Sequence, residues 1–263
     1  MPLSQANGLD IYYETAGSGP PLVMLHALPF DHNLWLYQVA RFSSRFTTIA
    51  LDLRGWGRSA KPTAPFSLRD MGDDALGVLA DLGVRERAVL LGCSIGSKIA
   101  VTLACEQPDR FAAAVLVGGN SGPQDFTHRI AAYRENSAAG TLREFHLSHL
   151  RHGVTQAWAD TPLGRYLLQG FVERGETLDA DSIAQVFRAL EGSDLTLKLP
   201  ECLVPTLIVN GEHDSARSAG ERTASMMKRA EHLVLPGTGH CCFLEDPESF
   251  DAAMGNFLAR QGY

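Results

Sequence analysis

Three features that this 263-residue sequence lacks are a disulfide pattern, a long apolar run and an excess of basic residues. Its five cysteines are odd in number and show no regular spacing, so we expect reduced thiols in a cytoplasmic protein. No apolar run reaches the roughly 18 residues that a membrane helix needs, and residues 1–6 lack the basic and apolar regions of a signal peptide. We therefore expect no membrane association. The net charge of -7 argues against nucleic acid as a partner.

Motifs for metals and nucleotides are also missing. The chain has no C-x-x-C or H-E-x-x-H pattern, and neither G-x-G-x-x-G nor a P-loop occurs. We therefore expect an activity that needs no metal and no cofactor. At 45% hydrophobic and 20% charged residues, the composition is close to that of an average soluble protein and provides enough apolar side chains for a large core.

Short apolar runs alternate with amphipathic stretches along the first 120 residues. An alternating stretch at 8–15 predicts an edge strand, and Ser67 with Asp70 resembles a capping box at a helix start. Strands that alternate with helices form parallel β-α-β units with helices on both faces of the sheet, and ligands bind at the carboxyl ends of the strands. Continuous apolar runs predict strands buried on both faces at 22–25, 47–53, 88–91 and 112–117.

This alternation stops after residue 122 and returns at 205–210. The segment between shows helical patterns and no strand, which we interpret as a helical cap over the site. The predicted fold class is α/β, with a mostly parallel central sheet in a core of residues 1–122 and 199–263, and an inserted cap of residues 123–198. The expected cap helices are 126–138, 141–151, 163–174 and 181–190, and the expected last helix is 247–260.

The pentapeptide Gly92-Cys93-Ser94-Ile95-Gly96 fits the pattern G-x-S-x-G. It follows the apolar run 88–91 and precedes a helical stretch, and this context is typical of a nucleophile elbow. Such a turn holds the serine in a strained conformation. Its flanking glycines allow strand and helix to approach closely, and the helix N-terminus directs free N–H groups toward an oxyanion. Ser94 is therefore the candidate nucleophile.

A serine hydroxyl needs a base, and the base needs an orienting carboxylate. In this architecture the chain order is nucleophile, acid, histidine. Asp214 follows the strand predicted near 207–210, and His240 follows the strand predicted near 233–235. Both lie just past strand carboxyl ends, so we expect them on the same edge of the sheet as Ser94. The candidate catalytic triad is Ser94, Asp214 and His240.

Together these features resemble the α/β-hydrolase superfamily over nearly the whole chain. The resemblance implies that fold, and segment 26–35 looks most like small bacterial esterases, lactonases and cofactor-free perhydrolases. Those relatives usually have glycine at the position of Ala27 and often at that of Ser97, so Ala27 narrows the room around its turn. The matching motifs are His26-Ala27-Leu28-Pro29, Asp52-Leu53-Arg54-Gly55-Trp56-Gly57-Arg58-Ser59, the elbow, Gly211-Glu212-His213-Asp214, and Gly239-His240 with Glu245-Asp246-Pro247 behind it.

The expected reaction is hydrolysis of a small carboxylic ester or lactone through an acyl-enzyme. Backbone N–H groups of Leu28 and Ile95 are the expected oxyanion hole. An acyltransferase, a perhydrolase or a carbon–carbon bond hydrolase would use the same triad. Some proteins of this superfamily keep the triad and act as small-molecule receptors, which is a fourth alternative. The oligomeric state stays open, a homo-oligomer included.

The predicted cap is rich in basic side chains. Arg143, His146 and Arg151 lie on or near one predicted helix, and they could offer positive charge to a substrate carboxylate if that face looks toward Ser94. The alternative is that these side chains line the outer face of a lid. A metal site is not expected there, because no nearby acid or cysteine completes a ligand set.

Other polar residues near the motifs are expected to be structural. Asp52 and Arg54 are interpreted as an ion pair beneath a loop. Cys93 precedes the nucleophile and is expected to be a small buried side chain. Lys98 lies one helical turn after Ser94 and is expected to be solvated or paired.

Overall fold

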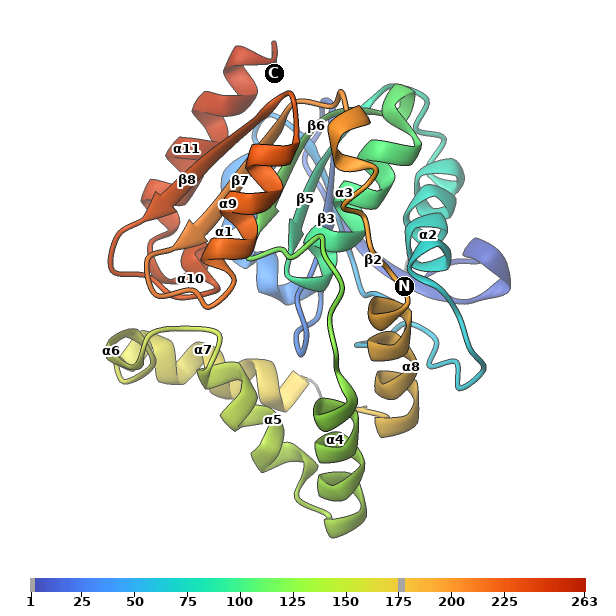
Figure 1. Cartoon of the computed structure of the whole chain (residues 1–263), viewed down its shortest axis with the longest axis vertical. Coiled ribbons are helices and arrows are strands. Elements are labelled where there is room, and N and C mark those ends of the chain that lie inside the picture. The colour runs from blue at the N-terminus through green and yellow to red at the C-terminus, as the bar shows by residue number, and fades with distance from the viewer. Residues whose placement is uncertain (1–2, 175–177) are drawn as a thin grey trace.

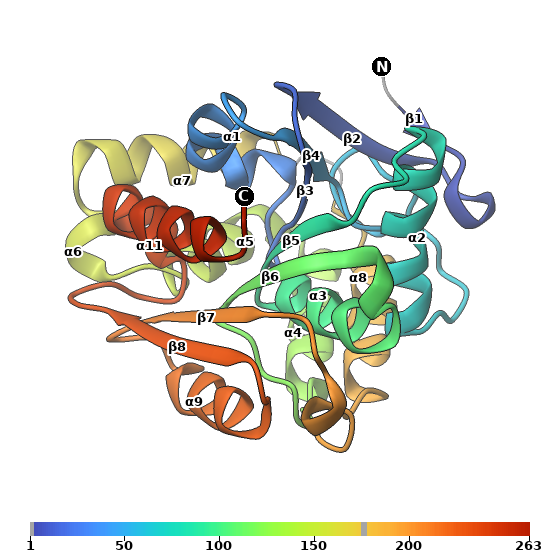
Figure 2. The same cartoon turned by 90° about the horizontal axis from the view of Figure 1, so that it is seen from above.

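The centre of the molecule is a mixed β-sheet, which lies between helices on both sides in Figure 2. The computed structural model describes residues 3–174 and 178–263. Within these ranges the strand order is β1-β2-β4-β3-β5-β6-β7-β8. The strands are β1 (Leu3–Ser4), β2 (Ile11–Ala16), β3 (Pro21–Leu25), β4 (Thr47–Leu51), β5 (Ala88–Cys93), β6 (Phe111–Val117), β7 (Thr206–Gly211) and β8 (Ala230–Leu235).

The sheet is parallel from β4 to β8, and the two N-terminal strands join it antiparallel. The stretch at 8–15 was predicted as an edge strand, and this is wrong. β2 pairs with β4 on one side and with the short β1 on the other, so β1 forms the edge. The predicted α/β fold class with a mostly parallel sheet is confirmed.

Helices cover both faces of this sheet because successive strand side chains point to opposite sides. In β3, Val23 and Leu25 pack into one core, whereas Leu22 and Met24 pack into the other. The first core lies beneath α2 (Leu68–Asp81), α3 (Ile95–Glu106) and α9 (Arg217–Met226), and the second lies beneath α1 (Leu36–Phe42) and α11 (Pro247–Arg260). The predicted capping box is present, since Ser67 and Asp70 exchange hydrogen bonds at the start of α2.

Short helices fill several of the connections. They are η1 (Ala6–Gly8), η2 (His32–Trp35), η3 (Pro108–Arg110), η4 (Leu199–Glu201) and α10 (Cys242–Glu245). Among the described residues, no helix is both long and apolar enough to span a bilayer.

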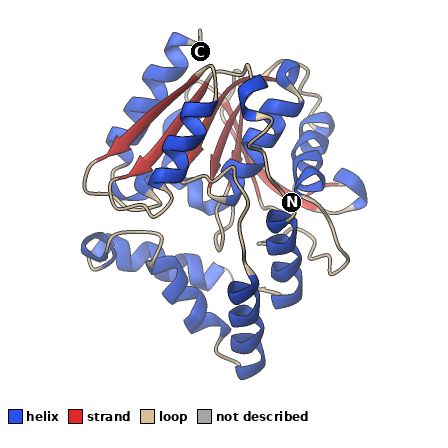
Figure 3. Cartoon of the chain, in the orientation of Figure 1, coloured by secondary structure: helices blue, strands red, loops and turns tan. Residues whose placement is uncertain are grey.

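Between β6 and β7 the chain forms a layer of helices beneath the carboxyl ends of the strands (Figures 1 and 3). The layer packs on the core through apolar side chains, for example Phe171 against Phe30 at a ring-centroid distance of 5.2 Å. The expected helices are present, and a short one, α6, was not predicted. The helices are α4 (Thr127–Ala139), α5 (Leu142–Arg151), α6 (Gln156–Ala159), α7 (Pro162–Arg174) and α8 (Ala180–Glu191); we call them the cap.

Candidate active site

Ser94 sits at the turn between β5 and α3 in a backbone conformation that few non-glycine residues adopt. Its φ is 55° and its ψ is -112°, which costs on the order of 1–3 kcal/mol. The flanking glycines are required by close approach. A Cβ on Gly92 would lie 2.3 Å from the carbonyl oxygen of Gly96, and one on Gly96 would lie 2.0 Å from that of Leu25. The turn therefore raises the Ser94 side chain into the pocket described below.

Asp214 and His240 are joined by a hydrogen bond of 2.8 Å between Oδ1 and Nδ1. Asp214 follows β7, and its carboxylate is fully buried. Two further donors fix that carboxylate: the side-chain amide of Asn210 at 2.7 Å and the backbone N–H of Ala216 at 2.8 Å. The carboxylate thus holds the imidazole with Nδ1 as the donor, which leaves Nε2 free to accept a proton.

Each member of this pair stabilises the charged form of the other. Burial by itself would raise the pKa of Asp214, but the hydrogen bond from His240 and its charge outweigh burial, and the pKa lies below its usual value. Burial by itself would lower the pKa of His240, and the hydrogen bond to Asp214 and its charge raise it instead. The imidazolium that forms when His240 takes a proton is therefore stabilised where it stands.

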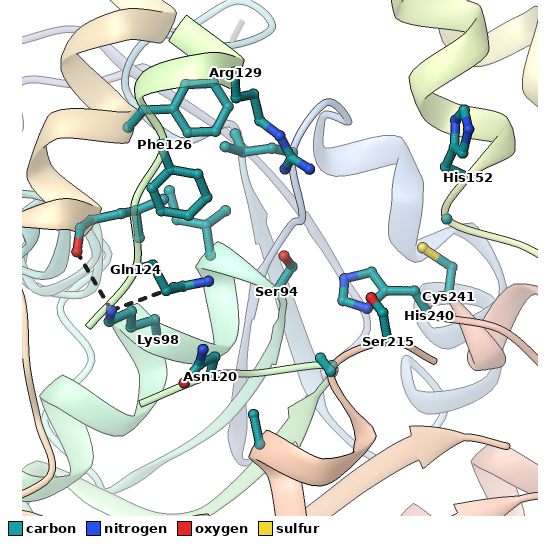
Figure 4. Close-up of a pocket in the computed structure, with 18 of the residues that line it drawn as sticks. Ser94, Lys98, Asn120, Gln124, Phe126, Arg129, His152, Ser215, His240 and Cys241 are labelled. Atoms are coloured by element: carbon teal, nitrogen blue, oxygen red, sulfur yellow. Dashed lines mark hydrogen bonds between the residues drawn. The ribbon is translucent and has the colours of Figure 1, made fainter. Parts of the chain in front are cut away.

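Ser94 and His240 face the same space in Figure 4. The hydroxyl of Ser94 has no hydrogen-bond partner within the described ranges. Gly118, at the end of β6, leaves room for the imidazole, because a Cβ there would lie 2.4 Å from Cε1 of His240. Leu28 and Ile95 line the same pocket, and Ile95 is the first residue of α3, where a backbone N–H has no acceptor within the helix.

The pocket has a volume of about 650 Å³ and lies between the core and the cap. Core residues from the segments after β3, β5, β6, β7 and β8 form one side, and residues of α4, α5 and α8 form the other. This volume is in the range usual for small-molecule sites.

Arg143, His146 and Arg151 were predicted to bind substrate, and none of them lines this pocket. Arg143 is exposed, and Arg151 pairs with Asp160 at 2.8 Å on the surface. His146 is buried, with Nε2 lying 2.6 Å from the carbonyl oxygen of Pro29. The prediction is corrected: α5 places His149 in the pocket, whereas the ring of His146 lies against the loop after β3 and both arginines lie outside the pocket.

Lys98 was expected to be either solvated or paired, and the structure shows it buried with its ammonium hydrogen-bonded. Only 2% of it is exposed, and its ammonium donates a hydrogen bond of 2.9 Å to the carbonyl oxygen of Gly122. Burial lowers the pKa of Lys98 to about 8. The side chain lines the pocket (Figure 4). Cys93 is fully buried, as predicted.

Asp52 and Arg54 do not form the predicted ion pair. Arg54 binds the carboxylate of Asp74 with two hydrogen bonds of 2.6 Å. Asp52 accepts hydrogen bonds from the backbone and the ring of His32. The ligand atoms of Asp31, His32 and Asp52 lie within 4.8 Å of one another. Asp31 caps η2, so all three side chains already take part in loop hydrogen bonds.

Two residues support the site in roles that the sequence did not assign to them. Asn210 holds Asp214, and its only sequence signal is its place at the end of a predicted strand. Glu245 accepts hydrogen bonds from Gly239 at 2.7 Å and from the backbone of Thr155 at 3.0 Å. It thereby ties the loop that carries His240 to the cap.

Comparison with known proteins places these features in a family. A family model described as "alpha/beta hydrolase fold" matches residues 20–247. The pimeloyl-[acyl-carrier protein] methyl ester esterase of Nitrosomonas europaea is 31% identical, with 92% of this chain and 96% of the relative covered. The non-heme haloperoxidase of Rhodococcus erythropolis is 26% identical, with 97% and 98% covered.

Among solved structures, the enol-lactonase from Burkholderia xenovorans superimposes with a TM-score of 0.89. The superposition covers 98% of this chain and 100% of that one at 24% identity. At this identity the likeness shows the shared fold.

Proposed function

This chain belongs to the α/β hydrolase fold family, and from that premise we propose that it is a serine hydrolase of small carboxylic esters or lactones. The observation that carries the proposal is one pocket that contains Ser94 at a strained turn and His240 already bonded to Asp214. A hydroxyl, a base and a carboxylate in that relation form an acyl-transfer site. The esterase of Nitrosomonas europaea, named for a methyl ester, supports an ester as the substrate.

In the proposed reaction, Ser94 attacks the acyl carbon while Nε2 of His240 takes its proton. Asp214 keeps the imidazole in the required tautomer and stabilises its positive charge. The oxyanion of the tetrahedral intermediate accepts hydrogen bonds from the N–H groups of Leu28 and Ile95. The leaving alcohol takes the proton from His240, and water then attacks the acyl-enzyme by the same steps to release the acid.

Turnover of p-nitrophenyl butyrate by wild type and by Ser94→Ala tests the proposal. We expect Ser94→Ala to lose about 10⁶-fold in kcat, the scale that the loss of a serine nucleophile causes in subtilisin. Ser218→Ala is a matched control, because Ser218 also lines the pocket but lies on the exposed rim. A Ser94→Ala variant that keeps a tenth of the wild-type kcat would overturn the proposal.

Product analysis identifies the acceptor of the acyl group. An acyl-enzyme reacts with any small nucleophile that reaches it, so the assay is repeated with added methanol and with hydrogen peroxide. We expect free acid as the main product in each case. Methyl ester or peracid as the main product would change the assignment to acyl transfer or perhydrolysis.

A further inference from the structure

The pocket that contains Ser94 is lined by basic side chains and, within the described ranges, by no aspartate or glutamate. Three of the lining residues carry a cationic group: Lys98, Arg129 and Arg222. The protein as a whole has a net charge of -7. The protein is negatively charged as a whole, so the positive charge of this pocket is a local feature. An anionic ligand would be complementary to it.

Arg129 on α4 is a cation of this pocket whose charge lies against aromatic side chains. No described residue forms an ion pair or hydrogen bond with its guanidinium, which lies over the rings of Phe126 and Phe187 at 5.9 and 5.8 Å. Two other cap arginines are paired, Arg134 with Asp181 and Arg151 with Asp160. Arg129 is therefore held in place by aromatic rings while its hydrogen-bond donors stay unused.

Arg129 is exposed to the open pocket, and the protein atoms around its guanidinium still desolvate the charge in part. Desolvation lowers the pKa of Arg129, yet an arginine stays charged at any pH where the protein is folded. Burial also lowers the pKa of its neighbour His149 to about 4, so that ring is neutral at neutral pH. A guanidinium without a partner in such surroundings is satisfied best by a planar anion that takes two hydrogen bonds, which is the geometry of a carboxylate.

The position of the pair formed by Ser94 and His240 tells which part of the substrate meets this cation. The leaving-group oxygen must lie beside His240, because that residue supplies its proton. In Figure 4, Lys98 and Phe126 lie on the side of Ser94 away from His240, and the guanidinium of Arg129 extends from the cap toward Ser94. The acyl group therefore occupies the part of the pocket that contains the cations.

We infer that the acyl group of the substrate carries a second carboxylate, bound by the guanidinium of Arg129, with Lys98 adding positive charge at the inner end of the pocket. The substrate class is thus a half-ester or lactone of a dicarboxylic acid. Hydrolysis adds the elements of water across the acyl–oxygen bond and releases a dicarboxylate and an alcohol, or a hydroxylated dicarboxylate from a lactone. This inference rests on the proposed function.

The test compares two esters with the same leaving group. Mono(p-nitrophenyl) glutarate carries the carboxylate, and p-nitrophenyl butyrate does not. We expect wild type to prefer the glutarate ester in kcat/KM, and Arg129→Met to lower the ratio of the two values by about 10- to 100-fold, the worth of one charge-assisted hydrogen bond. Arg134→Met is the matched control, since Arg134 is a cation of the same helix that lies outside the pocket. It should leave the ratio unchanged.

A preference for the neutral ester in wild type, or equal ratios in wild type and Arg129→Met, would overturn the inference. Both results presuppose turnover, so they leave the proposed function standing. Binding of monomethyl glutarate to the Ser94→Ala protein, measured by calorimetry, tests the carboxylate site without requiring ester hydrolysis. We expect the added Arg129→Met change to weaken this binding about 10- to 100-fold, and equal affinities would refute the carboxylate site even in a protein without ester hydrolysis.

Discussion

Replacing Asp214 with alanine removes the group that orients the proposed catalytic base. His240 loses an acceptor at 2.8 Å, so its ring can rotate and can place the proton on the wrong nitrogen. We expect kcat to fall by about 10⁴-fold, the scale found when a triad carboxylate is removed. The side-chain amide of Asn210 and the N–H of Ala216 also lose their acceptor. Each unsatisfied buried donor costs about 1–3 kcal/mol, so the free energy of unfolding should fall as well.

The pH dependence carries a second, independent signal. Asp214 raises the pKa of His240 against the effect of burial, so the acid limb of kcat/KM in wild type should lie above about pH 6.5, the ordinary value. In Asp214→Ala burial is no longer opposed, and the limb should move to lower pH.

The same pKa shifts set the pH range of the stability effect. His240, with a raised pKa, stabilises the fold below about pH 6.5, and this contribution is lost as pH rises through its folded pKa. Asp214, with a lowered pKa, stabilises the fold above about pH 3.9, and this contribution is lost as pH falls through its folded pKa. The stability difference between wild type and Asp214→Ala should therefore be largest between about pH 4 and pH 6.5.

The assay is ester hydrolysis from pH 4.5 to 9, with denaturant unfolding at three pH values. Glu212→Ala is the matched control, because Glu212 is an exposed acid two residues away in the same turn. It should keep wild-type kcat and the wild-type acid limb. A tenth of wild-type kcat in Asp214→Ala, or an acid limb that stays in place, would refute the role given to this carboxylate.

Three further predictions concern packing and can be measured by denaturant unfolding. Gly96→Ala should destabilise the fold by about 1–3 kcal/mol or prevent folding, because the new Cβ would lie 2.0 Å from the carbonyl oxygen of Leu25. Gly255→Ala in α11 has open space around the new Cβ, so it should stabilise the fold by about 0.5–1 kcal/mol, and a loss of stability would contradict the packing described. Arg54→Met leaves the buried carboxylate of Asp74 without its partner and should cost about 3–5 kcal/mol, whereas a change below 1 kcal/mol would show that the ion pair contributes little.

Features that depend on neighbours in the chain could be predicted from the sequence alone. The turn around Ser94 is an example, because two glycines and a strand–helix boundary leave few conformations for the residue between them. The last helix, predicted at 247–260, has the same bounds in the structure. Its signals, a proline in the first turn and apolar periodicity, are local. Chain order and strand ends also predicted that Asp214 and His240 would meet, and they form a hydrogen bond.

Features that depend on contacts between distant segments were decided by the tertiary structure. The sequence analysis predicted Asp52 as the partner of Arg54, and the packing of α2 gave it Asp74 instead. The rotation of α5 directs His149 rather than His146 to the pocket. A charged side chain binds whichever opposite charge the packing of apolar faces brings to it, and a helix turns by about 100° per residue. A small rotation that the sequence pattern does not specify therefore changes which residues meet the substrate.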